Sequence, residues 1–167
     1  MVRPLRFDAI EAARRNWEEH DLPEPDAMAA ATSIMRAEQI VSAAVEQALR
    51  PIGLTFARWE LLMLLTFSKH GSLPMTKIGD RLMVHPTGIS KLVDKLEEQQ
   101  LVRRDAHPTD RRTTLAMVLP AGRKLARHGA KAVADVRYGI DLGTTELRDL
   151  TRIITALRGD VGDFPSE

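Results

Sequence analysis

Two short helical segments separated by three residues constrain the fold of this chain more than any other feature. Residues 75–82 form the first segment, and we expect Thr76 to cap it. Residues 83–85 make a tight turn. Pro86 then occupies the first position of the second helix, where its missing N–H breaks no hydrogen bond. This order predicts a helix-turn-helix.

The second helix runs to about residue 99 and has one apolar face. Its apolar side chains recur at the i, i+3, i+4, i+7 spacing of a buried stripe, which is made of Ile89, Leu92, Val93 and Leu96. The start and outer face of this helix are small, polar or basic. In helix-turn-helix geometry this end enters the major groove, where hydroxyl groups and lysines meet base edges and phosphates. We therefore expect DNA contacts from Thr76, His85, Pro86, Thr87, Gly88, Ser90, Lys91 and Lys95.

A basic hairpin follows the second helix. Residues 101–105 and 113–119 read as two strands, and the segment between them is its tip. We expect Asp110 to hold the guanidinium of Arg112 in a charge-assisted pair, and the tip to enter a narrow minor groove. A hairpin in this place is the wing of a winged helix. Its expected DNA contacts are Arg104, Asp110, Arg111 and Arg112.

Helical patterns fill the remainder of the chain, so the fold class is mainly α with a small β-hairpin wing. Apolar stripes predict further helices over residues 8–20, 26–49, 55–67, 120–138 and 144–159. We expect Asp26 to cap the second of these and residues 71–74 to form a loop. The expected division is an N-terminal helical extension (1–25), dimerisation helices (26–54 and 120–158), a winged helix-turn-helix DNA-binding domain (55–119) and a C-terminal tail (159–167).

Positive charge is concentrated in the middle of the sequence. The 167-residue chain has a net charge of only +1, yet residues 75–127 carry 11 basic against 6 acidic residues, and both flanking parts are net −2. A local basic patch attracts phosphate within about a Debye length, roughly 8–10 Å. The alternative is a solvated basic surface that has no partner.

Several classes of protein are disfavoured by what the sequence lacks. Without cysteine there are no disulfides, thiolate metal sites or thiol sensors, and the five histidines are dispersed. Neither a glycine-rich phosphate loop nor a nucleophile elbow is found. No apolar run is long enough to span a membrane, and the N-terminus lacks the run of a secretion signal. We expect a cytoplasmic protein without cofactor, metal, membrane contact or enzymatic activity.

Four segments together resemble the signature of the multiple antibiotic resistance regulator (MarR) family. They are residues 75–99, Leu-Val-Arg-Arg at 101–104, Asp-Arg-Arg at 110–112 and Leu-Pro-Ala-Gly at 119–122, and the resemblance covers about residues 27–157. It implies a homodimer that binds a palindromic operator in double-stranded DNA, with an interface built by the N- and C-terminal helices. It also implies a repressor that a small aromatic or anionic effector, bound between the two lobes, releases from DNA.

One subgroup of the family, which responds to urate, carries an extra N-terminal helix and a pocket of a tryptophan, an acidic residue and two arginines. Similarity to this subgroup implies ligand contacts from Trp17, Glu60, Lys91 and Arg103 or Arg104; an Asp and an Arg of that pocket are replaced here. Trp59 is a further candidate. Each has a plain alternative, since Trp17 can anchor the extra helix, Trp59 can belong to the core and Glu60 can lie on a helix surface.

Two functions from different classes are compatible with these patterns. The first is a ligand-responsive, sequence-specific transcription regulator, which needs the basic central segment for DNA. The second is a winged helix that docks another protein, in which the basic patch is incidental and specific DNA binding is absent. Loss of the wing arginines distinguishes the two, because it removes DNA affinity only in the first.

Overall fold

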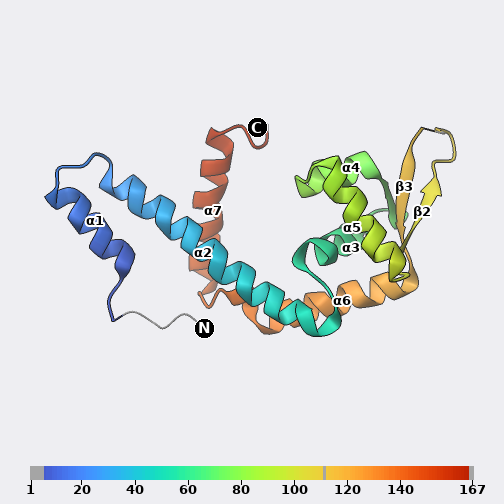
Figure 1. Cartoon of the computed structure of the whole chain (residues 1–167), viewed down its shortest axis with the longest axis horizontal. Coiled ribbons are helices and arrows are strands. Elements are labelled where there is room, and N and C mark those ends of the chain that lie inside the picture. Colours follow the sequence, from blue (N-terminus) through green and yellow to red (C-terminus); the bar gives the residue numbers. More distant parts are fainter. Residues whose placement is uncertain (1–5, 111, 166–167) are drawn as a thin grey trace.

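The N-terminal helices and the wing lie at opposite ends of an elongated molecule (Figure 1). The computed structural model describes residues 6–110 and 112–165. Its elements, in chain order, are α1 (Ala9–Glu19), α2 (Pro25–Leu49), η1 (Arg50–Ile52), α3 (Phe56–Phe67), β1 (Ser72–Pro74), α4 (Met75–Leu82), α5 (Pro86–Glu98), β2 (Val102–Ala106), β3 (Thr114–Val118), α6 (Pro120–Asp135), η2 (Arg137–Gly139) and α7 (Thr144–Asp160). The helix-turn-helix and the wing gather at one end, and α2 and α6 connect this end with α1 and α7.

Side-chain caps explain where three of the helices begin. Asp8, Thr55 and His85 each accept hydrogen bonds from first-turn amides, of α1, α3 and α5 respectively. These amides have no partner within the helix, so a cap replaces the water that they would otherwise bind. Pro86 is the first residue of α5, as its sequence position indicated. The expected starts of these three helices are confirmed.

Two other expected caps are wrong. Helix α4 begins at Met75, so Thr76 is its second residue and Pro74 takes the cap position. The reason is that Pro74 still belongs to a strand, which holds the chain extended up to the first helical residue. Helix α2 begins at Pro25, one residue before Asp26. Asp26 instead lies in the first turn of α2, where its carboxylate meets Arg14 of α1 at 3.5 Å.

The sheet has three strands rather than two. Residues 72–74, which we expected to be part of a loop, form β1 and pair antiparallel with β3, giving the strand order β1-β3-β2. A three-residue strand that ends in proline shows no alternation, so the sequence could not reveal it. The expected pairing of β2 with β3 is confirmed, with Val102 opposite Val118 and Ala106 opposite Thr114. Strand β1 connects the helix-turn-helix with the wing, because it pairs with β3 and is followed directly by α4.

Helix α6 ends earlier than its apolar pattern suggested. It stops at Asp135 rather than near residue 138. Three consecutive residues, Arg137, Tyr138 and Gly139, then have φ angles of 50°, 54° and 75°. These left-handed conformations are incompatible with a continuing right-handed helix. The chain therefore changes direction before α7, and Tyr138 is directed back toward Trp59, with ring centroids 6.3 Å apart.

The core lies in the winged helix and where α6 crosses α3. Close approach of these two helices depends on Gly129, because a Cβ at this position would lie 2.4 Å from Cδ1 of Trp59. Trp59 in turn donates a hydrogen bond from Nε1 to the carbonyl of Ala126 at 3.1 Å. The largest fully buried side chains are Leu49, Leu61, Leu62, Leu65, Ile78, Ile89, Val93, Leu96, Val102 and Val133.

Helix α7 packs extensively on no other element of the described chain and has no buried residue. Its expected apolar stripe is present, but Leu150, Ile153 and Leu157 are 41–55% exposed. Ile34, Met35 and Ile40 leave a similar apolar surface on α2. Among the described residues, no helix combines the length and the hydropathy that a membrane crossing requires.

Candidate nucleic-acid interface

Helix α5 divides its residues between the core and the surface. Ile89, Val93 and Leu96 are at most 1% exposed, and Leu92 is partly buried. This fixes the helix against α3, α4 and β2. The opposite face is exposed and carries Pro86, Thr87, Ser90, Lys91 and Lys95, together with Asp94. The division expected from the spacing is therefore confirmed, while the role of the outer residues remains a proposal.

The first turn of α5 is held in place by His85. Nδ1 of His85 accepts a hydrogen bond from the amide of Thr87 at 3.4 Å, and it lies 3.1 Å from Oγ1 of the same residue. Gly88 follows, and a Cβ here would lie 2.8 Å from Cγ1 of Val84. Gly88 therefore leaves space for Val84 in the turn between α4 and α5. We also expect a DNA contact from Gly88, and this packing is a second reason for a glycine here. The first turn of α5 is thus capped by His85 and exposed at Pro86 and Thr87.

The tip of the wing is organised by Asp110, although not as we expected. Oδ1 of Asp110 accepts a hydrogen bond from the backbone amide of Arg112 at 3.0 Å, and Oδ2 accepts one from the hydroxyl of Thr113 at 2.6 Å. The expected pair with the Arg112 guanidinium is wrong, because these closer donors occupy the carboxylate. The bonds from Thr113 and the Arg112 amide lower the pKa of Asp110. Arg111 lies outside the described residues.

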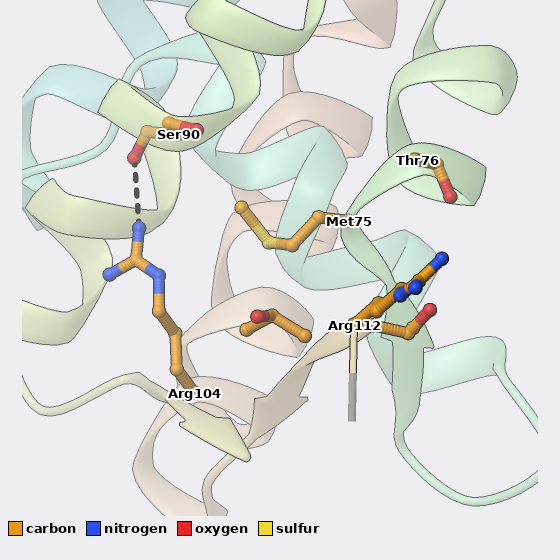
Figure 2. Close-up of a pocket in the computed structure, with 7 residues that line it drawn as sticks. Met75, Thr76, Ser90, Arg104 and Arg112 are labelled. Carbon is orange, nitrogen blue, oxygen red and sulfur yellow. Dashed lines mark hydrogen bonds between the residues drawn. The ribbon is translucent and has the colours of Figure 1, made fainter. Parts of the chain in front are cut away.

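A cavity of about 300 Å³ lies between helices α4 and α5 and the wing. Figure 2 shows Arg104 on one side of it, below Ser90, and Arg112 on the other side, near Thr76; Met75 lies between them. Thr113 and Thr114 complete the lining. Four residues that the sequence suggested from separate segments are thus brought together: Thr76, Ser90, Arg104 and Arg112. Sequence reasoning missed Met75 and the two threonines, which gave no signal beyond standing next to the expected residues.

Arg104 is engaged by α5 rather than free. Its guanidinium donates hydrogen bonds to Asp94 at 2.6 Å, to Glu97, and to the carbonyl of Ser90 at 3.3 Å. Burial would lower the pKa of Arg104, but the hydrogen bonds and charges of Asp94 and Glu97 outweigh it and raise that pKa. Lys95 also has a partner, Glu98, at 2.8 Å. Among the described residues, Lys91 and Arg112 make no ion pair.

The candidate ligand residues are spread over the chain. Trp17 donates from Nε1 to the carbonyl of Pro23 at 3.1 Å, which closes the turn between α1 and α2 and supports the anchor interpretation. Arg103 donates to Asp105 at 3.1 Å and, among the described residues, makes no hydrogen bond to α5, unlike Arg104. Glu60 is partly buried on α3, and this burial raises its pKa. None of these three residues lines the cavities described in this section.

Two further cavities contain the remaining candidates. An apolar one of about 390 Å³ lies between α2, α3 and η2, and Trp59 lines it with Phe56 and Tyr138, so Trp59 serves both the core and a cavity wall. An open one of about 550 Å³ lies between the start of α3 and α5, and Lys91 lines it with Arg58 and Lys95. Sequence reasoning missed Arg58 and Tyr138. Within the described ranges, no three His, Asp or Glu side chains are placed to hold a metal ion.

Comparison with known proteins identifies the arrangement. The sequence model of the MarR family matches residues 54–114, which span α3 to the start of β3. The crystal structure of Sco5413, a MarR family transcriptional regulator from Streptomyces coelicolor, has 42% identity and a TM-score of 0.77, with 84% of this chain and 99% of that chain covered. Sco3205 from the same organism, solved in complex with DNA, has 25% identity and a TM-score of 0.73 over 81% and 89% of the chains.

A curated relative agrees over a shorter segment. The HTH-type transcriptional regulator MhqR of Bacillus subtilis is 42% identical over 52 residues. This segment is 31% of the present chain and about a third of MhqR, at 36%. The Sco5413 match, in contrast, extends over nearly all of that structure and over far more of this chain than the winged helix alone. The chain therefore belongs to the MarR family of transcription regulators, with the winged helix-turn-helix fold of that family.

Proposed function

We propose that this protein is a ligand-responsive, sequence-specific DNA-binding transcription repressor that binds a palindromic operator as a homodimer. The observation that carries the proposal is the exposed reading end of α5, with Thr87, Ser90 and Lys91, beside a wing that presents Arg112. Sco3205, which shares this fold, was solved in complex with DNA. Hydroxyl groups on a helix that fits the major groove read base edges, and the cations around them bind phosphates.

Fluorescence anisotropy with DNA from upstream of the gene tests this function. We expect salt-sensitive binding that random DNA of equal length does not displace. Lys91→Ala and Arg112→Ala should each lower the affinity and reduce the slope of log K against log salt by about one unit. Lys131→Ala on α6 is the matched control, because Lys131 pairs with Asp135 at 2.8 Å and lies outside the interface. Equal affinity for all sequences would favour a protein-docking winged helix instead.

The proposed homodimer is supported by apolar surface that one chain leaves uncovered. The stripe of α7 and the apolar side chains of α2 lie on the same half of the molecule, away from the wing (Figure 1). Burial of apolar surface is favourable by roughly 25 cal/mol per Å², so a second copy that covers these helices is stabilised. Two copies would then place their α5 helices about one DNA turn apart, roughly 34 Å. Sedimentation that shows only monomers at micromolar concentration would contradict this part of the proposal.

For the effector we propose a small aromatic acid that binds in the open cavity beside α5. Arg58, Lys91 and Lys95 supply positive charge there, and Val84 and Leu92 supply apolar contact. Lys91 belongs both to this cavity and to the exposed face of α5. A bound carboxylate would therefore compete with phosphate for the same ammonium group, which links ligand binding to release of DNA.

A thermal-shift screen of aromatic acids, urate included, identifies ligands, because binding to the folded state raises its stability. Arg58→Ala should abolish the shift and leave DNA binding intact, since Arg58 lines the cavity at the start of α3 and not the outer face of α5. Tyr138→Ala is the complementary variant. A shift that survives Arg58→Ala and disappears with Tyr138→Ala would place the ligand in the apolar cavity instead.

A further inference from the structure

Arg104 of β2 forms hydrogen bonds that join the wing to helix α5. Its three acceptors on α5 are the carbonyl of Ser90 and the carboxylates of Asp94 and Glu97. These residues have the spacing i, i+4, i+7, so they lie in one stripe along the helix. The backbone amide of Arg104 also donates to Glu97 at 2.8 Å. Both the main chain and the side chain of Arg104 are therefore oriented by α5.

The contacts of Arg104 also compensate the negative charge of Asp94 and Glu97. Asp94 is exposed on α5 between Lys91 and Lys95, on the side that carries the reading residues. An unpaired carboxylate in this position would repel DNA phosphate, and Glu97 would add to the repulsion. The guanidinium of Arg104 contacts both carboxylates at once and compensates their charge. Nη1 and Nη2 of Arg104 already donate to acceptors on α5, so binding a phosphate through them would mean breaking these contacts.

We propose that Arg104 is a positioning residue, which sets the wing against the recognition helix and shields Asp94 and Glu97, rather than a direct DNA contact. The inference rests on the proposed DNA-binding function and replaces the role that the sequence suggested for Arg104. The planar fork of arginine is required, because it reaches several acceptors in fixed directions, whereas the ammonium group of lysine is a single point of charge.

A double-mutant cycle between Arg104 and Asp94 tests the proposal by DNA anisotropy. Arg104→Ala should weaken operator binding about tenfold or more in the natural background, and Asp94→Asn alone should change it by no more than about threefold. In the Asp94→Asn background, Arg104→Ala should cost clearly less, because one repulsive carboxylate is gone. Arg104→Lys should restore little of the affinity. The salt slope should remain within about half a unit of the natural value in all variants.

An equal loss of affinity in both backgrounds, with a salt slope lower by about one unit, would overturn the proposal and make Arg104 a phosphate contact. Hydrogen exchange without DNA gives an independent readout. Arg104→Lys, which keeps the charge and is expected to fold, should speed amide exchange in β2 and β3, whereas the control Lys131→Ala should not. Unchanged exchange in the wing would also overturn the positioning role, even if the natural protein shows no sequence preference and the proposed function itself fails.

Discussion

Helices α5 and α7 have similar amphipathic patterns, but within one chain the apolar stripe of α5 is buried and that of α7 is exposed. The apolar stripe of α5 is at most 1% exposed at Ile89, Val93 and Leu96, whereas that of α7 remains about half exposed at Ile153 and Leu157. Periodicity alone predicts one buried face for each of the two helices. What differs is the set of neighbours, because α3, α4 and β2 surround α5, and α7 extends away from the rest of the chain (Figure 1).

This difference indicates that the winged helix completes its own core, whereas the helices at the other end leave apolar surface that the proposed second copy would cover. Mutations in the two regions should consequently have different signatures. A change in α5 should alter the stability of each chain irrespective of protein concentration. A change in α7 should alter a property that depends on concentration, because a dimer is stabilised by mass action.

The largest expected effect is that of Leu96→Ala. Leu96 is fully buried, so its truncation should lower the free energy of unfolding by about 2–5 kcal/mol, through lost burial and the cavity that remains. Urea unfolding at two protein concentrations, tenfold apart, measures this. The difference between natural protein and variant should be the same at both concentrations. A loss below about 1 kcal/mol would mean that neighbouring side chains relax into the space left by Leu96. The packing around α5 and α7 would then differ less than their exposed fractions indicate.

Second in size is Ile153→Ala in the middle of the α7 stripe, where the side chain is 55% exposed in one chain. If a second copy covers it, truncation should weaken the dimer by about 2 kcal/mol, the size of an interface hot spot. Sedimentation equilibrium measures the dissociation constant. Thr151→Ala on the same helix is the control, since its hydroxyl only donates to the carbonyl of Leu147. An unchanged constant for Ile153→Ala would exclude this stripe from the interface.

The sequence predicted those parts of the fold that a local pattern of residues determines. Pro86 begins α5, alternating residues form β2 and β3, and the spacing of Ile89, Val93 and Leu96 marks a buried face. It failed where the outcome depends on contacts across the chain. Strand β1 exists because β3 offers it a partner, and that pairing shifts the start of α4 away from Thr76.

Four of the residues that line the cavity between α5 and the wing were expected from the sequence, but their contacts with one another were not. Thr76, Ser90, Arg104 and Arg112 do meet around one cavity, as a winged helix requires. Which acceptor each donor finds was beyond the sequence, because Asp110 has nearer donors than the Arg112 guanidinium and Arg104 finds Asp94 and Glu97 only after folding.

Third in size is Gly122→Ala, at the junction of α6 with the wing. A Cβ at this position would lie 2.2 Å from the carbonyl oxygen of Leu101 and 2.9 Å from Cγ2 of Val118. A backbone oxygen cannot rotate away, so we expect a loss of about 1–2 kcal/mol in urea unfolding. Gly143→Ala is the matched control, because the added methyl meets only the end of the Glu146 side chain. Similar losses in the two variants would argue against close packing at Gly122.

The smallest expected effect concerns Glu60 and has the opposite sign. Burial raises the pKa of this carboxyl group above its reference value of 4.5, so its ionised form is disfavoured in the folded state. The penalty is complete well above the folded-state pKa and disappears as the pH falls below 4.5. Glu60→Gln should therefore raise Tm slightly at pH 7 and leave it unchanged at pH 4.

Thermal unfolding at both pH values measures this difference, and it also bears on the comparison between the two regions. A carboxylate that costs stability inside the self-sufficient winged helix is retained for some other reason, such as a contact with a ligand. If Glu60→Gln instead lowers Tm at pH 7, the carboxylate has a stabilising partner in the assembled protein. Among the described residues none forms an ion pair with Glu60, so Glu60→Gln would then be compared at protein concentrations above and below dimer dissociation, to test whether a second copy supplies the partner.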